Sequence, residues 1–230
     1  MFRKCLSFTM AACMAGLLAL TGCGDVSDSS DSSSDTAATS PAAAAADTTA
    51  AAENAGSYSF NGGKFVITLY PDKAPITCEN FEKLVSEGFY DGLTFHRVVE
   101  DFMAQGGDPM GNGMGGSDET IKGEFASNNV QNDLSHTRGV VSMARSQMPD
   151  SASSQFFICY TDDCTFLDGN YAAFGMVTEG MDMVDAFLEV PRSLGGDGAM
   201  SSPDDPIVID KAVMIEPDAD GNPRAEFTMK

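Results

Sequence analysis

The sequence predicts a mainly β fold, an all-β barrel with helical caps, and three observations favour it. Short runs of β-branched and aromatic residues recur from residue 58 onward, separated by Gly, Pro, Asn and Asp. Only two stretches have the apolar spacing of a helix, so strand and helix do not alternate as in a parallel α/β sheet. Hydrophobic residues make up 43% of the chain, enough for one buried core. Many short strands with few helices are typical of closed barrels.

Seven strands and two helices are expected in this domain. The first strand is Lys64–Tyr70, with the sequence KFVITLY. The first helix is expected to begin near Pro75, with Thr77 as its N-cap, and to stop at Gly88. The second helix is expected at Glu179–Leu188. The other strands are expected at Thr94–Val99, Phe102–Gln105, Gly139–Met143, Gln155–Tyr160, Ala172–Val177 and Ile207–Ile215.

The first 23 residues have the pattern of a lipoprotein signal peptide. Two basic residues precede an apolar run, Leu6–Leu20, that is too short to span a membrane. The run ends in Leu20–Cys23 (LTGC), which resembles the lipobox of bacterial lipoproteins, in which cleavage precedes a cysteine that carries a diacylglycerol. An ordinary secretory signal with an incidental cysteine is the alternative. We expect residues 1–22 to be removed and Cys23 to anchor the protein to a bacterial membrane, on its extracytoplasmic side.

Residues 23–57 are expected to form a disordered linker between the lipidated cysteine and a folded domain at 58–230. From residue 24 on, the segment has six acidic residues and no aromatic or basic one. It cannot bury enough apolar surface to offset the entropy lost on ordering. The linker would hold the folded domain away from the membrane.

The charge balance excludes two classes of partner. The chain has 13 Lys and Arg against 34 Asp and Glu, a formal net charge of −21. Such a surface repels the phosphates of nucleic acids and of anionic lipids. No nucleic-acid partner is expected, and any membrane attachment must come from the lipid anchor.

The cysteines do not form a disulfide framework. Three of the six lie at or before Cys23, which leaves Cys78, Cys159 and Cys164 in the domain, an odd number without a repeated spacing. Cys78 has the features of a small buried hydrophobe. Cys159 and Cys164 could pair in an oxidising compartment, and the sequence leaves this open.

No cofactor or metal is expected. Gly111–Gly116 matches the dinucleotide-binding pattern G-x-G-x-x-G in form, but neither the required strand nor the required helix flanks it. Asp218–Asn222 is similar to the start of a calcium loop but lacks the later ligands. The two histidines, His96 and His136, have no nearby group of ligating residues in the sequence.

Several ordered motifs identify a family resemblance that covers about residues 58–216. Thr94–Val99 (TFHRVV), followed by Phe102–Pro109 (FMAQGGDP), resembles the signature of cyclophilins. The resemblance implies an eight-stranded antiparallel closed β-barrel capped by two α-helices, and peptidyl-prolyl isomerase activity without a cofactor. Further matches follow in family order at Gly139–Ala144, Ser151–Ile158, Phe166–Gly169 and Phe174–Gly175.

Arg97 is the expected catalytic residue. Rotation about an Xaa-Pro bond needs no nucleophile, but it needs a site that favours the twisted amide over either planar form. The proline nitrogen of the twisted amide accepts a hydrogen bond, and a guanidinium is a permanently charged donor. The alternative for Arg97 is a surface arginine in a salt bridge. The resemblance favours catalysis and implies that Gln105 orients Arg97 and holds the substrate backbone.

The resemblance also implies a substrate site around the proline ring. Alternation places Phe156 and Phe157 on opposite faces of one strand, so that one ring is core and the other is free to line a pocket, and the resemblance selects Phe157. Ordinary core residues are the alternative for all the apolar members. The implied substrate-binding residues are Phe102, Met103, Ala144, Arg145, Gln155, Phe157, Phe166, Leu167 and Tyr171.

Two of these positions depart from the family pattern. Many members carry Trp where this chain has Phe166, and His where it has Tyr171. Phe166 lacks the indole N–H that donates to cyclosporin in such members, so we expect weak binding of cyclosporin-type inhibitors. Tyr171 keeps an aromatic wall with a hydroxyl group.

The leading functional hypothesis is a monomeric isomerase that assists the folding of exported, proline-containing polypeptides. The first alternative is a module that binds or scaffolds proline segments with little turnover. A surface adhesin or structural lipoprotein would explain the anchor but not the pocket residues. The client proteins, the preferred residue before proline and the identity of the membrane do not follow from the sequence.

Overall fold

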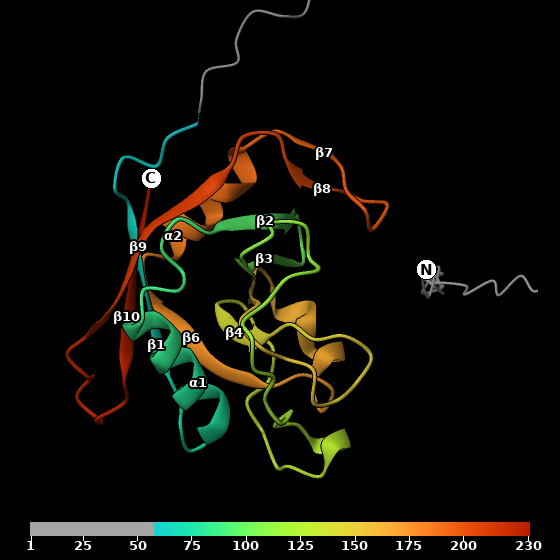
Figure 1. Ribbon diagram of the computed structural model, residues 1–230, viewed down its shortest axis with the longest axis vertical. Coiled ribbons are helices and arrows are strands. Elements are labelled where there is room, and N and C mark those ends of the chain that lie inside the picture. The colour runs from blue at the N-terminus through green and yellow to red at the C-terminus, as the bar shows by residue number, and fades with distance from the viewer. Residues whose placement is uncertain (1–57) are drawn as a thin grey trace, which may run out of the picture. The chain divides into compact units, whose positions relative to one another are not determined.

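The computed structural model describes residues 58–230, and these form a closed barrel of eight strands. The expected signal peptide, Cys23 and the linker to residue 57 lie outside the described residues. The strand order around the barrel is β1-β10-β9-β2-β3-β5-β4-β6, and all neighbouring strands pair antiparallel. The predicted eight-stranded antiparallel barrel is therefore confirmed (Figure 1).

The barrel is accompanied by a separate hairpin and short helices. A two-stranded sheet pairs β7 (Arg192–Leu194) with β8 (Met200–Pro203) and projects beyond β2 in Figure 1. The helices are α1 (Pro75–Ser86), α2 (Met181–Asp185) and the 3-10 turns Ala126–Asn128, Asp162–Leu167 and Ala186–Glu189. The barrel strands are β1 (Lys64–Leu69), β2 (Thr94–Val99), β3 (Met103–Asp108), β4 (Val140–Met143), β5 (Phe156–Cys159), β6 (Ala173–Glu179), β9 (Ile207–Ile215) and β10 (Arg224–Met229).

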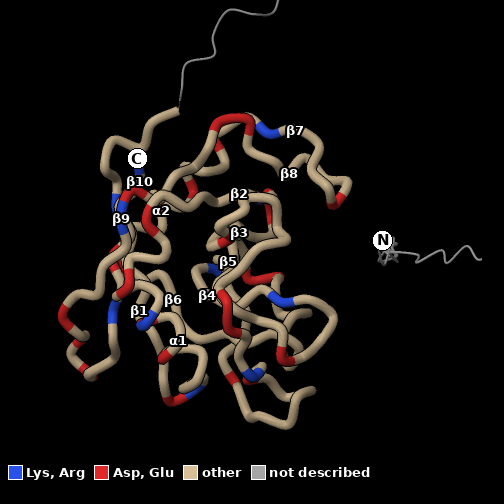
Figure 2. Tube along the Cα trace, in the orientation of Figure 1, with Lys and Arg blue, Asp and Glu red and all other residues tan. Residues whose placement is uncertain are grey.

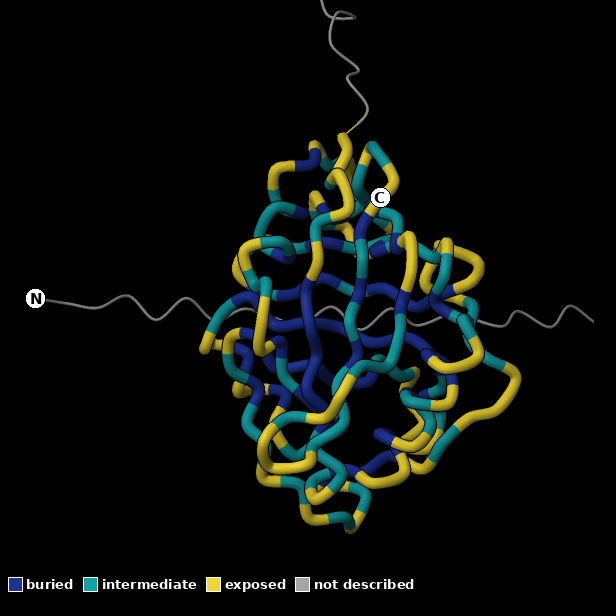
Figure 3. Tube along the Cα trace, turned by 90° about the vertical axis from the view of Figure 1, so that its left-hand side faces the viewer, coloured by how far each residue is buried: buried dark blue, intermediate teal, exposed yellow. Residues whose placement is uncertain are grey.

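Aromatic rings fill the barrel and fix α1 against it. Phe81 of α1 is fully buried, and its ring centroid lies 5.0 to 6.1 Å from those of Tyr90, Phe156, Phe174 and Phe227. Such offset and edge-on pairs stabilise a core beyond the area that they bury. Buried backbone accordingly runs through the middle of the domain, with exposed loops around it (Figure 3).

The predicted cap of the first helix is wrong. The helix begins at Pro75, and Ala74 precedes it without a side-chain hydrogen bond. The free N–H groups instead meet the carboxylate of Glu124, which accepts from the backbone of Ile76 and from both the backbone and the hydroxyl of Thr77. A buried carboxylate from a distant segment thus satisfies the helix end, as the helix dipole favours.

Three elements differ from the prediction at the C-terminal side. Glu179 ends β6 rather than starting a helix, and α2 is one short turn before it tightens into a 3-10 helix. The hairpin of β7 and β8 was not predicted, nor was Arg224–Met229, the strand β10 that pairs with β1 and β9 and closes the barrel. Asp218–Asn222 is the turn before it, held by hydrogen bonds to the Asp218 carboxylate.

Acidic residues are spread over the surface of the domain, and basic residues are few (Figure 2). Among residues 58–230, no helix is long and apolar enough to cross a membrane. In the same range, no group of three or more His, Cys, Asp or Glu side chains is placed to hold a metal ion.

Candidate active site

A register shift in β2 turns Arg97 out of the barrel. Phe95 pairs with Gly106 and Arg97 pairs with Gln105, so His96 is an extra residue between them, as in a β-bulge. Phe95 and Val98 are both buried in the core, three residues apart. Strict alternation would have placed Arg97 on the same face as Phe95. The bulge therefore frees Arg97 for the outer face.

Arg97 belongs to a chain of hydrogen-bonded side chains. Its Nη1 donates to Gln105 Oε1 at 3.4 Å, and Gln105 Nε2 donates to Gln155 Oε1 at 2.9 Å. Gln155 Nε2 in turn donates to the carbonyl of Gly115 at 2.7 Å. On its other side, Arg97 Nε donates to Asp197 Oδ2 at 2.6 Å. The guanidinium is thus held at two edges.

An apolar cluster lies beside this chain, on the outer face of β3 and β5. Phe156 points into the barrel core, whereas Phe157 belongs to this second cluster, so alternation separates the two rings as predicted. The Arg97 guanidinium lies 5.8 Å from the ring centroid of Phe102 at the cluster edge. The cluster contains Met103, Phe157, Cys159, Cys164 and Leu167, with Val99, Phe102, Ala144 and Tyr171 packed against it.

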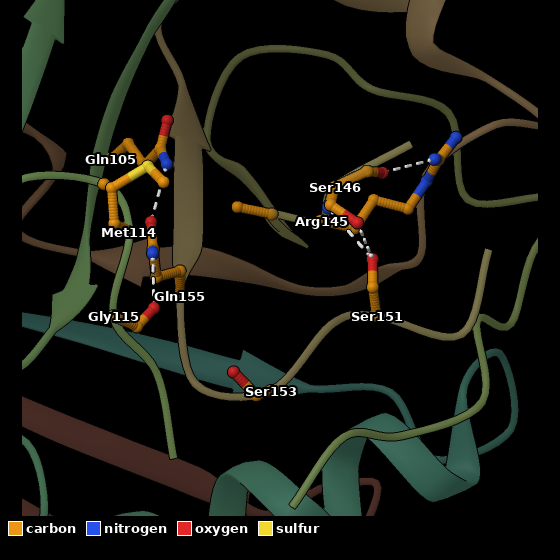
Figure 4. A pocket seen from close by; sticks show the side chains of 10 residues that line it. Gln105, Met114, Gly115, Arg145, Ser146, Ser151, Ser153 and Gln155 are labelled. Atoms are coloured by element: carbon orange, nitrogen blue, oxygen red, sulfur yellow. Dashed lines mark hydrogen bonds between the residues drawn. The ribbon is translucent and has the colours of Figure 1, made fainter. Parts of the chain in front are cut away.

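A polar hollow of about 210 Å³ lies beside the apolar cluster and is lined in part by Gln105 and Gln155 (Figure 4). Ser151 closes one side, where its hydroxyl bonds to the hydroxyl of Ser146 at 2.8 Å. Met114 forms another part of its wall, and its side chain is exposed. The hollow has room for part of an extended chain that lies against the apolar cluster.

Arg145 lines this hollow but is held in place by the protein. Its Nε and Nη2 both donate to the carbonyl of Asn170, at 2.9 and 2.8 Å. Its guanidinium lies over the rings of Tyr171 and Phe125, 4.7 and 5.0 Å from their centroids. The backbone N–H of the preceding Ala144 donates to the Gln155 carbonyl at 2.9 Å. Arg145 therefore lies between the polar hollow, which it lines, and Tyr171 at the edge of the apolar cluster.

His136 supports the apolar cluster from behind. Its ring stacks on Phe157 with centroids 6.0 Å apart, and its two nitrogens contact Asp168 and Ser142 at 2.7 and 2.9 Å. Burial lowers the pKa of His136, although the hydrogen bond to Asp168 acts in the opposite direction. A neutral ring thus fixes the position of Phe157. His96 is also partly buried, and burial lowers its pKa.

The three cysteines of the domain are free and buried. Cys78 donates to the Phe174 carbonyl at 3.4 Å, and burial raises its pKa to about 12. Cys159 and Cys164 lie in the apolar cluster, where Cys164 donates to the Phe102 carbonyl at 3.3 Å. Burial also raises the pKa of Cys159. All three are packing residues rather than nucleophiles.

The structure brings most of the expected site residues together and adds two. Phe166 is the outermost, 63% exposed, with its ring 5.6 Å from that of Phe102. Phe166 carries no ring N–H, which is the basis for expecting weak cyclosporin binding. That expectation stays a prediction. Sequence reasoning missed Asp197, which contacts Arg97, and the support that His136 gives to Phe157. The turn Gly195–Gly198 (GGDG) was a signal for a placed Asp, but nothing in the sequence joined it to Arg97.

This arrangement can bind an apolar ring and can polarise a group that lies beside Arg97. The apolar cluster fits a ring without polar atoms, and Arg97 directs a permanent charge along its edge. Gln105 and Gln155 offer donors and acceptors for a peptide backbone. The thiols of Cys159 and Cys164 are buried within the cluster, and burial raises the pKa of Cys159, which disfavours a reactive thiolate.

Comparison with known proteins agrees with this geometry. The family model described as cyclophilin type peptidyl-prolyl cis-trans isomerase/CLD matches residues 57–214. The peptidyl-prolyl cis-trans isomerase ppi1 of Schizosaccharomyces pombe is 43% identical over 156 residues, which cover 66% of this chain and 94% of that protein. The peptidyl-prolyl cis-trans isomerase B of Bacillus subtilis is 47% identical over 122 residues, which cover 53% and 81% of the two chains.

Solved structures give the same result. A cyclophilin type peptidyl-prolyl cis-trans isomerase of Cryptosporidium parvum, crystallised in the presence of the dipeptide Ala-Pro, superposes with a TM-score of 0.56 at 29% identity. The match covers 65% of this chain and 96% of that one. The family match spans the whole barrel apart from its last strand, and it includes Arg97, Gln105 and the apolar cluster. This chain therefore belongs to the cyclophilin-type peptidyl-prolyl cis-trans isomerases.

Proposed function

We propose that this isomerase acts on exported polypeptides at the extracytoplasmic surface of a bacterial membrane, and that Arg97 accelerates the reaction electrostatically. The observation that carries the mechanism is the placement of Arg97, whose guanidinium lies at the edge of the apolar cluster and is held by Gln105. The location rests on the lipobox-like sequence Leu20–Cys23.

The energetic problem of the reaction is amide resonance. Rotation about a peptide bond crosses a barrier of about 18–20 kcal/mol, and free Xaa-Pro bonds exchange over tens to hundreds of seconds. In the twisted amide, the proline nitrogen regains its lone pair and accepts a hydrogen bond. A donor placed beside that nitrogen stabilises the twisted state more than either planar state, and this difference is catalysis.

The geometry of the site supports this mechanism. A proline ring in the apolar cluster would rest on Phe157 and Met103, with its nitrogen toward the open edge where Arg97 lies. Gln105 and Gln155 would hold the backbone on either side of the bond that rotates. The adjoining polar hollow would receive residues that precede the proline.

The mechanism is tested by Arg97→Ala, measured by exchange NMR on an Ala-Pro peptide. Loss of a charged donor used only in the transition state should lower the turnover rate about a hundred- to thousandfold. The affinity for the peptide should change far less, because the apolar cluster is intact. Arg97→Lys should restore only part of the rate, because an ammonium cannot donate to the substrate and to Gln105 in one fixed plane.

The same experiment separates turnover from binding alone. A wild-type protein that binds the peptide without accelerating exchange would support the scaffold alternative. A folded Arg97→Ala protein with the wild-type rate would contradict the role of Arg97. Circular dichroism of each variant excludes unfolding as the cause of a lost rate.

The anchor is tested by Cys23→Ala. One short acyl chain holds a protein to a membrane only marginally, whereas two or more hold it stably. The variant should therefore leave the membrane fraction or accumulate unprocessed, while the unchanged protein resists a high-salt wash. A processed Cys23→Ala protein that stays in the washed membranes would show that another feature attaches it.

A further inference from the structure

The hairpin of β7 and β8 carries an aspartate to the catalytic arginine. Asp197 lies at its tip, between Gly196 and Gly198. The tip is a tight turn in which the N–H of Gly195 donates to the Ala199 carbonyl at 2.8 Å. A Cβ at Gly195 would come within 2.2 Å of the Ser201 hydroxyl, and Gly198 has a φ of +78°. The glycines thus allow a turn that few other residues could form.

Asp197 is itself held by the hairpin. Its Oδ1 accepts from the backbone N–H of Ala199 at 3.0 Å and from the hydroxyl of Ser201 at 2.7 Å. Its Oδ2 accepts from Arg97 Nε at 2.6 Å. The side chains of Asp197 and Arg97 are only 25% and 30% exposed. A carboxylate with three donors in a partly buried place is a fixed negative charge.

Asp197 and Gln105 bind different nitrogens of the Arg97 guanidinium. Asp197 takes the Nε edge of the guanidinium, and Gln105 accepts from Nη1 at the other end. Two contacts on different edges fix both the position and the plane of a rigid, flat group. The Nη side remains turned toward the edge of the apolar cluster. A carboxylate that blocked the site would instead cap the Nη side.

We propose that Asp197 is a positioning residue for isomerisation: it holds the Arg97 guanidinium in the orientation in which Nη donates to the twisted amide. This inference rests on the proposed role of Arg97. Asp197 does not touch the substrate and acts through Arg97. The alternative is a plain structural bridge that fastens the hairpin to the barrel.

The test compares Asp197→Asn, which keeps the size of the side chain and removes its charge, with Asp204→Asn. Asp204 directly follows β8 and accepts from the Ser193 hydroxyl, so the control removes the same charge from the hairpin without touching Arg97. Asp197→Asn should lower the turnover rate about tenfold with KM within about twofold, whereas Asp204→Asn should leave both unchanged. Equal losses in the two variants would make the bridge merely structural.

A double-mutant cycle shows whether Asp197 acts through Arg97. In the Arg97→Ala background, Asp197→Asn should have no further effect on turnover, since there is no guanidinium left to position. Independent losses that multiply would overturn the proposal. The cycle also keeps the two hypotheses apart: a full rate in Arg97→Ala contradicts the mechanism itself, whereas a low rate in Arg97→Ala with a full rate in Asp197→Asn contradicts only this inference.

Discussion

The two faces of strand β5 serve different purposes. Phe156 points inward and lies within 6 Å of the rings of Phe81, Tyr90, Phe95 and Phe227. Phe157, the next residue, points outward into a small cluster that polar side chains surround. One residue step along the strand thus separates the barrel core from the candidate site.

The difference shows how a barrel supports a site without a deep cavity. The inner face is filled by large, fully buried rings. The outer face carries only a small apolar cluster. His136 stacks on its Phe157, and Arg97 lies over the ring of Phe102 at its edge. Rigid packing on one face therefore fixes the geometry of the other, which is what a preorganised site requires.

The largest effect is expected on the inner face. Phe156→Ala removes a fully buried ring with aromatic neighbours on several sides, and such a change costs about 3–5 kcal/mol of unfolding free energy. Urea unfolding followed by circular dichroism measures the loss. Turnover per folded molecule should also fall, but less than in Arg97→Ala, because Arg97 and Gln105 keep their own contacts. A loss below about 1 kcal/mol would mean that the two faces do not differ in the way described.

A smaller and different effect is expected on the outer face. Phe157→Ala should cost about 3 kcal/mol of stability, the low end for a buried ring, because its cluster is smaller than the barrel core. It should also raise KM for an Ala-Pro peptide roughly five- to tenfold, since the proline ring loses its main apolar contact. Steady-state kinetics below the unfolding transition give both parameters. An unchanged KM would remove Phe157 from the substrate site.

Much of this arrangement follows from local sequence patterns. Alternation alone separates Phe156 from Phe157, and most strands lie where β-branched runs predict them. Strand β10 was missed although Ala225, Phe227 and Met229 alternate as buried residues with polar ones. Its period of two was present, but Thr228 is its only β-branched residue, and such residues are what make a strand obvious in a sequence.

The remaining features depend on contacts between distant parts of the chain. Glu124 caps a helix that begins about fifty residues earlier, and Asp197 reaches Arg97 across the barrel surface. The bulge at His96 arises because Phe95 and Val98 both pack inside, and strict alternation would have turned Arg97 inward. No local propensity encodes these outcomes, since tertiary packing selects them.

The smallest effect expected is a pH dependence that belongs to the outer face. His136 has a side chain only 1% exposed, and burial lowers its pKa below the value of about 6.5 found in unfolded chains. Below that pH, the unfolded chain takes up a proton that the folded protein does not. The contribution of His136 to the unfolding free energy is therefore at its maximum above about pH 6.5. It decreases as the pH falls toward the folded pKa, by at most about 1.4 kcal/mol per pH unit.

Comparison of the wild type with His136→Gln isolates this contribution between pH 7 and pH 5. The carboxylate of Asp168 does not interfere: burial acts to raise its pKa, but the hydrogen bonds from Ser135 and His136 outweigh burial and lower the pKa from 3.8, so its contribution is lost only at still lower pH. The stability curve of the variant should be flatter than that of the wild type. His96→Gln should also flatten the curve, since burial lowers that pKa too, but it should not disturb the ring of Phe157. Comparison of the two variants therefore separates the pH dependence due to His136, which supports Phe157, from that due to His96, which does not. Parallel curves for the wild type and His136→Gln would show that His136 titrates as it does in the unfolded chain, which would contradict this prediction.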